Sequence, residues 1–143
     1  MFQEIIIESV DELPEVAGEL LKKAGARKKF ALTGDLGAGK TALIQAFCKR
    51  LGVRQNVTSP TFAIANEYSY TEDDGREQVV HHLDLYRLKT EQEAIEAGVV
   101  EMVEDANFCF IEWPDLIDSL LPEDVFRIKI TILPSAARKI LFL

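Results

Sequence analysis

A glycine-rich segment in the first third of the chain carries residues suited to binding a chain of phosphates. Its spacing is G-x-x-x-x-G-K-T. Glycines let the backbone wrap an anion so that its N–H groups face the oxygens. The lysine would bring a positive charge to the β and γ phosphates, and the threonine hydroxyl is placed to ligate an accompanying Mg²⁺. The predicted phosphate loop comprises Gly34, Asp35, Leu36, Gly37, Ala38, Gly39, Lys40 and Thr41.

The residues on either side of this loop predict the elements that position it. The apolar run Phe30–Leu32 precedes the loop, and Leu43, Ile44, Phe47 and Leu51 follow it at helical spacing. This order predicts a strand, the loop and then a helix, whose N-terminal dipole would point at the anion. The alternative is a plain glycine turn between a strand and a helix. The complete motif with both flanks favours phosphate binding.

Two carboxylates that end apolar strands are candidates for the catalytic part of such a site. Asp84 follows Val79–Leu83, as the second-motif aspartate of a P-loop protein does, and Glu112 follows Phe108–Ile111. Ligands of α/β proteins bind at the carboxyl ends of parallel strands, so both side chains could reach the phosphates. The alternative for each is an acidic residue that marks where a strand meets solvent. The phosphate loop favours the functional interpretation.

Three further features leave more than one interpretation open. Thr61 follows Ser59 and Pro60, so its hydroxyl could approach a γ-phosphate as a switch residue, although threonines commonly begin strands. His82 and Asp84 share a strand face and could ligate a metal, but no third ligand has a helpful spacing. Trp113 could serve either in packing or in stacking on a base.

Composition limits the classes of protein to consider. A chain of 143 residues with 48% hydrophobic content predicts one domain spanning residues 1–143. The net charge of −8 argues against direct RNA binding through a broad basic face. Cys48 and Cys109 stand at positions that look buried, which suggests no disulfide framework. No window resembles a signal peptide or a membrane span, so we expect a cytoplasmic protein without membrane contact.

Periodicity predicts a three-layer α/β P-loop domain with a mixed sheet, parallel around the ligand and antiparallel towards the hairpins. Ser9 and Glu12 resemble a capping box, but Pro14 would then lie inside the helix, so the regular helix is expected to begin nearer Pro14. The predicted helices are 14–24, a helix that begins at the glycine loop and ends at Gly52, 90–103 with a break near Gly98, and 114–121. The predicted strands are 2–8, 30–32, 61–70, 78–85, 107–112, 125–133 and 138–143.

Four motifs in this order resemble the TsaE (YjeE) family, which takes part in making the threonylcarbamoyladenosine modification of tRNA. They are GDLGAGKT at 34–41, SPTF at 59–62, HLDLYRL at 82–88 and IEW at 111–113. A weaker R-x-I-x-F ending begins at Arg138, so the resemblance covers nearly the whole chain. It implies a small Mg²⁺-dependent ATPase that binds ATP and ADP and acts with the proteins TsaD and TsaB. That pair transfers the threonylcarbamoyl group to A37 of tRNAs reading ANN codons, so the tRNA would be handled by partners.

The resemblance also implies roles for individual residues. Gly37–Thr41 would hold the phosphates, and Thr41, Glu112 and Asp84 would form the Mg²⁺ site, in which Asp84 resembles a Walker-B-like aspartate. Thr61 looks like the switch threonine, and Trp113 like the tryptophan beside the site. The implied catalytic residues are Lys40, Thr61, Asp84 and Glu112. The N-terminal nucleotide contact would fall near Ser9, although no motif fixes its register. Ala42 replaces a frequent second threonine.

Two other functions remain open from the sequence. A small-molecule or nucleotide kinase would use the same loop, but no arginine-rich lid follows Asp84, where Arg87 and Lys89 give way to an acidic stretch through Glu104. A nucleotide-gated binding module would use ATP to set its affinity for a partner, with hydrolysis incidental.

Overall fold

The computed structural model describes residues 2–60 and 63–143. Its helical elements are η1 (Val10–Glu12), α1 (Leu13–Ala24), α2 (Lys40–Leu51), α3 (Glu91–Glu96), α4 (Val99–Glu104) and η2 (Pro114–Leu120), where η marks 3₁₀ helices. Its strands are β1 (Gln3–Ile7), β2 (Lys29–Gly34), β3 (Ala65–Thr71), β4 (Glu77–Asp84), β5 (Phe108–Glu112), β6 (Phe126–Ile132) and β7 (Arg138–Phe142).

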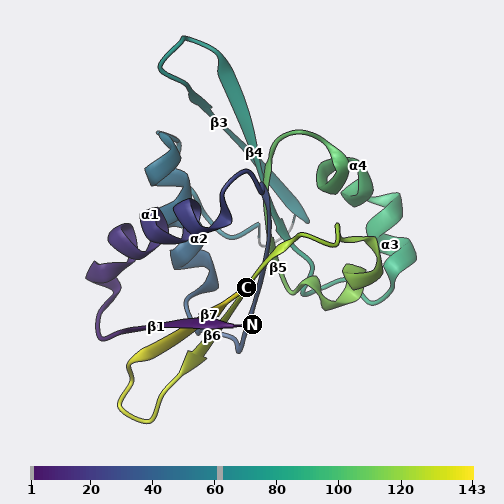
Figure 1. Cartoon of the computed structure of the whole chain (residues 1–143). Coiled ribbons are helices and arrows are strands. Elements are labelled where there is room, and N and C mark those ends of the chain that lie inside the picture. The colour runs from purple at the N-terminus through teal and green to yellow at the C-terminus, as the bar shows by residue number, and fades with distance from the viewer. Residues whose placement is uncertain (1, 61–62) are drawn as a thin grey trace.

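The strands of the described residues form one mixed sheet in the order β1-β7-β6-β2-β5-β4-β3. The central strands β6, β2, β5 and β4 are parallel to one another. The outer pairs β1–β7, β7–β6 and β3–β4 are antiparallel. Helices α1 and α2 cover one face of the sheet, and α3, α4 and η2 cover the other (Figure 1). The predicted α/β fold with a partly parallel sheet is confirmed.

An aromatic cluster beneath α2 forms the centre of the core. The ring of Phe30 on β2 lies 5.2 Å from that of Phe47 on α2, and 5.1 Å from those of Phe110 and Phe126 on the flanking strands. All four side chains are buried. Such edge-to-face contacts add to the burial of apolar area. These contacts therefore fix β2, the strand that leads into the glycine loop, to both neighbouring strands and to α2.

A second apolar cluster joins the opposite face of the sheet to α3, α4 and η2, and includes Leu83, Ile111 and Ile117. Cys48 and Cys109 are buried free thiols, and burial raises the pKa of each to about 12. Within residues 2–60 and 63–143, no helix has both the length and the apolar character that crossing a membrane requires.

The first helical region accommodates both the capping box and Pro14. Ser9 and Glu12 do form a capping box, but it caps the short η1, and α1 begins only at Leu13. Pro14 then lies in the first turn of α1, where its missing N–H removes no helical hydrogen bond. The expected start near Pro14 is confirmed.

Two predicted elements differ from the structure. The strand predicted for 61–70 begins only at Ala65, because Ala63 and Ile64 form a bend and their neighbours 61 and 62 lie outside the described residues. The alternation of polar and apolar residues extends further towards the N-terminus than the pairing with β4 does. Alternation alone therefore could not mark the first residue of β3. The predicted helix 114–121 is a 3₁₀ helix interrupted at Ile117.

Candidate functional site

The glycine loop lies at the carboxyl end of β2, where the parallel strands of the sheet end. Gly34 cannot be replaced without moving the backbone, because a β-carbon there would lie 2.6 Å from the carbonyl oxygen of Ile130 on β6. Gly39 has φ +111° and precedes the first residue of α2. Both positions therefore require glycine if the loop is to turn directly from the strand into the helix.

Arg138 on β7 holds the outer side of this loop. Its Nε donates a hydrogen bond of 3.0 Å to the carbonyl oxygen of Ala38. Sequence reasoning gave Arg138 no place in the site, although the R-x-I-x-F ending was the available signal. The hydrogen bond links the C-terminal hairpin to the conformation of the loop.

The side chain of Lys40 folds back over the loop. Its ammonium group donates to the carbonyl oxygens of Gly34 and Asp35, at 2.5 and 3.1 Å, and lies 4.2 Å from the ring centre of Trp113. Burial lowers the pKa of Lys40, while the negative charges of Glu112, Asp84 and Asp35 act in the opposite direction. A nearly buried cation surrounded by carbonyls and carboxylates can exchange these partners for phosphate oxygens.

Thr41 and Glu112 meet although they are far apart in the sequence. The Thr41 hydroxyl is 3.1 and 3.0 Å from the two carboxylate oxygens of Glu112. Glu112 is also 2.7 Å from Nε2 of His82, whose side chain is fully buried. The first residues of α2 and the last residue of β5 are thus joined, and His82 holds the carboxylate from behind.

Asp84 lies beside Glu112, because these residues are paired in the parallel register of β4 and β5. One of its carboxylate oxygens accepts from the Ser59 hydroxyl at 3.2 Å, and the other accepts from the backbone N–H of Tyr86 at 3.0 Å. The predicted convergence of the two strand-end carboxylates therefore exists in the structure.

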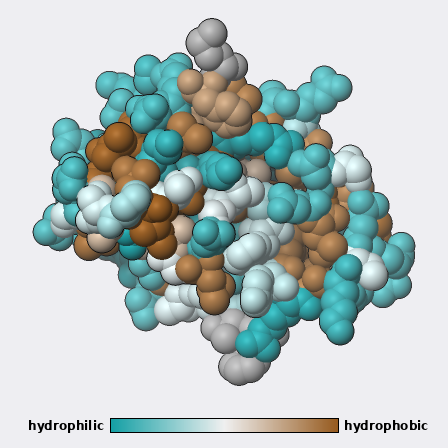
Figure 2. Space-filling model, turned by 90° about the horizontal axis from the view of Figure 1, so that it is seen from below, coloured by the Kyte–Doolittle hydropathy of each residue, from teal (hydrophilic) through white to brown (hydrophobic). Residues whose placement is uncertain are grey.

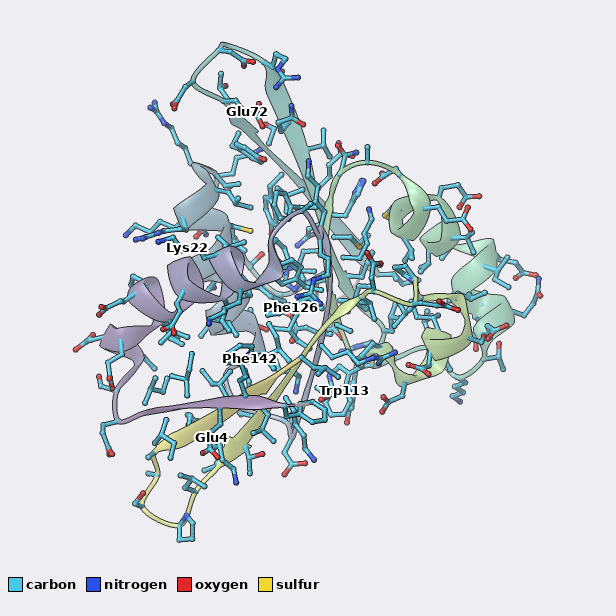
Figure 3. The ribbon with its side chains drawn as sticks, in the orientation of Figure 1. Glu4, Lys22, Glu72, Trp113, Phe126 and Phe142 are labelled. Carbon is cyan, nitrogen blue, oxygen red and sulfur yellow. The ribbon has the colours of Figure 1, made fainter. Side chains whose placement is uncertain are left out.

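Trp113 directly follows β5 and adopts the left-handed conformation, with φ 57° and ψ 56°. This conformation costs a residue with a β-carbon about 1 kcal/mol or more. It accompanies the placement of the indole over Lys40, with its ring centre 4.9 Å from that of the exposed Tyr86. Trp113 lies at the lower end of the central strands in Figure 3.

A cavity of about 250 Å³ opens between these groups. Its lining consists of Leu36, Gly37, Gly39, Lys40, Thr41, Ala42, Ser59, Asp84, Tyr86, Glu112 and Trp113. Figure 2 shows the molecule from below, the side on which β2 enters the glycine loop in Figure 1. Residues of intermediate hydropathy cross the middle of this face.

The structure brings most of the predicted site residues together. Of the predicted loop, Gly34, Asp35 and Ala38 do not line the cavity. Ser9 does not line it either; its exposed side chain instead accepts a hydrogen bond from the N–H of Asp11. Thr61 lies outside the described residues. Sequence reasoning assigned no site role to Ala42, Ser59 or Tyr86. The available signals were that Ala42 directly follows the glycine motif and that Ser59 and Tyr86 belong to the SPTF and HLDLYRL motifs.

The alternative of a metal site built from His82 and Asp84 is not supported by their contacts. His82 pairs with Glu112, while Asp84 bonds Ser59 and a backbone N–H. In the part of the chain that the structure describes, no group of three or more His, Cys, Asp and Glu side chains is arranged to hold a metal ion.

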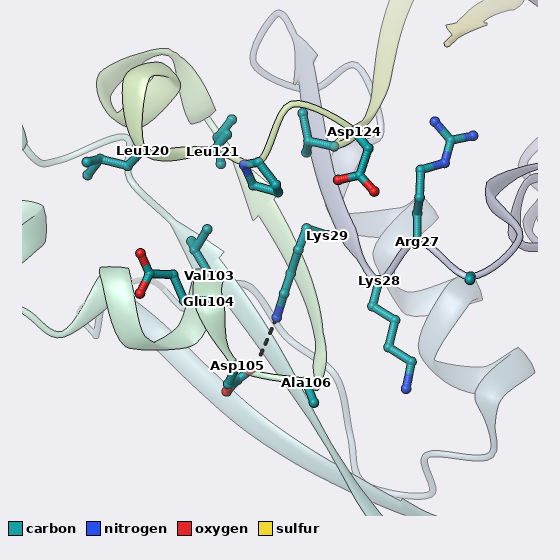
Figure 4. A pocket seen from close by; sticks show the side chains of 13 residues that line it. Arg27, Lys28, Lys29, Val103, Glu104, Asp105, Ala106, Leu120, Leu121 and Asp124 are labelled. Carbon is teal, nitrogen blue, oxygen red and sulfur yellow. Dashed lines mark hydrogen bonds and ion pairs between the residues drawn. The ribbon is translucent and has the colours of Figure 1, made fainter.

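A larger cavity of about 710 Å³ lies near the beginning of β2, away from the glycine loop (Figure 4). Beside it, the Lys29 ammonium donates to Asp105 at 2.9 Å and to the carbonyl oxygens of Met102 and Asn107 at 3.0 and 2.6 Å. Asp105 also contacts Nε2 of His81 at 2.9 Å. These contacts fasten the end of α4 to β2 and β4.

The Asp105 contacts predict a loss of stability in acid. Burial alone would raise the pKa of Asp105, but hydrogen bonds from Lys29, Asn107 and His81 outweigh it and lower the pKa to about 2. Because the folded pKa is depressed below 3.8, the stabilisation is present above pH 4 and is lost as pH falls towards 2. We expect Asp105→Asn to remove about 1–2 kcal/mol of pH-dependent stability after screening by solvent.

Chemical denaturation of the wild type and Asp105→Asn at pH 7, 4 and 2.5 measures this effect, and the difference between them should shrink towards pH 2.5. Asp124→Asn is the matched control, because Asp124 is an exposed carboxylate lining the same cavity. Parallel stability curves for the wild type and Asp105→Asn would contradict the assignment.

Comparison with known proteins identifies the family. Residues 7–140 match the family model described as threonylcarbamoyl adenosine biosynthesis protein TsaE. The chain belongs to the TsaE family. The tRNA threonylcarbamoyladenosine biosynthesis protein TsaE of Bacillus subtilis is 35% identical over 133 residues, which cover 90% of this chain and 80% of the relative. The TsaE protein of Treponema pallidum is 33% identical over 87% of this chain and 86% of its own length.

A solved structure agrees with the family assignment. The crystal structure of Bacillus subtilis YdiB aligns with a TM-score of 0.74 and 28% identity, covering 99% of this chain and 84% of YdiB. This TsaE-family chain therefore shares its fold with YdiB over nearly its full length.

Proposed function

We propose that this TsaE-family chain is a Mg²⁺-dependent ATPase required for forming threonylcarbamoyladenosine at position 37 of tRNAs reading ANN codons. The observation that carries the proposal is the contact between Thr41 of the glycine loop and Glu112 of β5. It joins a phosphate-binding motif to a carboxylate at a sheet edge, which is the arrangement that hydrolysis of a nucleoside triphosphate needs. The names of the relatives support the place in tRNA modification.

The donor set fits Mg²⁺ delivered with a nucleotide. A hydroxyl and one or two carboxylates are the usual protein ligands of Mg²⁺, which takes its remaining ligands from phosphates and water. Thr41 and Glu112 would hold the ion, with Asp84 beside them, and the bound ion would neutralise charge on the β and γ phosphates. Since few protein ligands are needed, the proposal is compatible with a site of only two or three side chains.

The remaining residues of the cavity would orient the nucleotide. Lys40 would exchange the carbonyls of Gly34 and Asp35 for phosphate oxygens, while its ammonium keeps its contact with the Trp113 ring. Asp84 would orient a water molecule towards the γ-phosphate, its own position being held by Ser59 and the N–H of Tyr86. After hydrolysis the glycine loop would hold the product ADP.

The ATPase would act with TsaD and TsaB, which would carry out the transfer to tRNA. We infer that nucleotide binding and hydrolysis control docking to this pair. A P-loop kinase would instead pass phosphate to an added acceptor without needing either protein. A nucleotide-gated binding module would sustain tRNA modification without hydrolysis.

Lys40→Ala separates these functions. Loss of the buried ammonium should weaken ATP binding by about 100-fold and abolish hydrolysis at moderate ATP, because charge-assisted hydrogen bonds to phosphate are lost. ATP turnover, binding to TsaD with TsaB, and tRNA modification should be measured for the wild type and Lys40→Ala. Lys89→Ala removes an exposed lysine and serves as the control.

We expect wild-type turnover to rise when TsaD and TsaB are added, and Lys40→Ala to support little tRNA modification. Full modification by Lys40→Ala without hydrolysis, at an ATP concentration high enough to restore binding, would make hydrolysis dispensable and favour the binding module. Phosphate transfer by the purified wild type to a small-molecule or nucleotide acceptor would favour the kinase.

A further inference from the structure

Positive and negative charges gather in different segments of the chain. Residues 22–54, which include the end of α1 and all of α2, contain nine Lys and Arg and a single Asp. Residues 90–124, which include α3, α4 and η2, contain eleven Asp and Glu and neither Lys nor Arg. These layers lie on opposite sides of the sheet (Figure 1). The basic side of the molecule is therefore the end of the α1 and α2 layer that carries Lys22, Lys23, Lys49, Arg50 and Arg54, whereas Arg27, Lys28 and Lys29 line the cavity beside Glu104 and Asp105.

A groove of about 530 Å³ lies on the basic side, between the end of α2 and the segment that follows it. It is lined by Gln45, Lys49, Val53, Arg54, Gln55, Asn56 and Val57, with no carboxylate among them. Lys49 and Arg54 are exposed, and no ion pair joins either of them to another residue of 2–60 or 63–143. Two uncompensated cations thus face solvent at one groove.

Two amide side chains fix the walls of this groove. Gln45 on α2 donates to the carbonyl oxygen of Val57 at 2.8 Å, and the Gln55 side-chain oxygen accepts from the N–H of Ser69 on β3 at 2.8 Å. The segment after α2 is thereby held between the helix and the edge strand of the sheet. The groove is therefore preformed, which lowers the entropic cost of filling it.

Cations at the ends of α1 and α2 extend the basic area. Arg50 lies across α1, because a β-carbon built at Gly18 would come within 2.6 Å of its guanidinium. Lys22 and Lys23 are exposed in the last turn of α1, and Figure 3 labels Lys22 there. The potential around the groove is the sum of these charges, which is expected to attract an anionic partner.

We propose that this groove binds an acidic, extended segment of a partner protein, and that in the proposed function, on which this inference rests, the segment belongs to TsaD or TsaB. Carboxylates of the segment would pair with Lys49 and Arg54. The side-chain N–H groups of Asn56, and those of Gln45 and Gln55 that do not bond within this chain, would donate to backbone carbonyls of the segment. Complementary charge of this kind speeds association and selects the partner.

Two other anionic occupants fit the groove less well. No aromatic residue lines it for stacking on bases, and a neighbouring cavity beside Leu51 is edged by the carboxylates of Glu72, Asp73 and Asp74 at the tip of the β3–β4 hairpin. The occupant is therefore expected to leave the groove away from this acidic hairpin tip, and the lack of a stacking platform is what disfavours a nucleic acid. A second copy of the chain could offer its acidic layer, but such a head-to-tail contact would build rings or filaments rather than a two-fold dimer.

The test compares Lys49→Glu/Arg54→Glu with Lys89→Glu/Lys129→Glu, which changes the net charge equally at exposed lysines outside the groove. Affinity for TsaD with TsaB is measured by calorimetry at low and high salt, with ATP present. The groove variant should bind at least about tenfold more weakly at low salt and lose most of its salt dependence. Its ATP turnover in the absence of partners and its melting temperature should match those of the control variant.

Each other result overturns a defined part of the scheme. Equal weakening in both variants, or none in the groove variant, would overturn the groove assignment while leaving the proposed function intact. Loss of tRNA binding or of self-association by the groove variant, with unchanged affinity for TsaD and TsaB, would assign the groove to RNA or to a second copy. Failure of the wild type to bind TsaD and TsaB would overturn the partnership itself.

Discussion

Glu112→Gln should reduce ATP turnover in the presence of TsaD and TsaB by at least about 100-fold, while ATP binding falls by less than about tenfold. The substitution preserves the shape of the side chain and its capacity to bond Thr41 and His82, but removes the negative charge. Nucleotide affinity depends mainly on the loop and Lys40, which do not change. The proposed metal ligation depends on the charge, which is lost.

Glutamine is preferred to alanine at this position because His82 is fully buried and bonds Glu112 through Nε2. Removing the whole side chain would leave that nitrogen without a partner at a cost of about 1–3 kcal/mol, which would mix a folding defect with a catalytic one. Glu104→Gln, at an exposed glutamate on α4, is the control. Wild-type turnover by Glu112→Gln at equal Mg²⁺ would remove Glu112 from the reaction.

Phe30→Ala should lower the free energy of unfolding by about 3–5 kcal/mol. Phe30 is fully buried and its ring contacts those of Phe47, Phe110 and Phe126, so truncation would leave a cavity bordered by three rigid rings. Such a site collapses poorly, which places the cost towards the upper part of the range. Urea denaturation of the wild type and the variant measures the change.

Phe2→Ala is the matched control for this substitution, because Phe2 is 55% exposed and its truncation should cost less than about 1 kcal/mol. Phe30 also belongs to the strand that ends in the glycine loop, so Phe30→Ala should weaken ATP binding at temperatures where the fold persists. A cost below about 1 kcal/mol for Phe30→Ala would show that the aromatic cluster is not the centre of the core.

Local sequence signals predicted the parts of the site that are themselves local. The glycine loop, the strand before it and the helix after it follow from residues adjacent in the chain. Asp84 and Glu112 were also predictable, because each ends an apolar strand and parallel strands end at a common edge. Their proximity required only that β4 and β5 be neighbours, which the structure confirms.

Other features depended on information that no short segment contains. The pairing of His82 with Glu112 follows from the register of β4 against β5, since alternation placed His82 on the face of Asp84 without naming its partner. Arg138 reaches Ala38 across 100 residues of sequence, so only the folded hairpin places it at the loop. The net charge of −8 likewise argued against a broad basic face, but a sum cannot show where the remaining cations gather in the folded chain.

Trp113 is the single tryptophan of the chain, and its indole lies over the ammonium of Lys40. Ultraviolet emission excited selectively through tryptophan therefore arises at one defined point, at the wall of the candidate cavity, with Tyr86 as its aromatic neighbour. An optical signal that in most proteins averages over several sites is here a local probe of the environment of one cation. The unmodified chain carries its own spectroscopic label for the glycine loop.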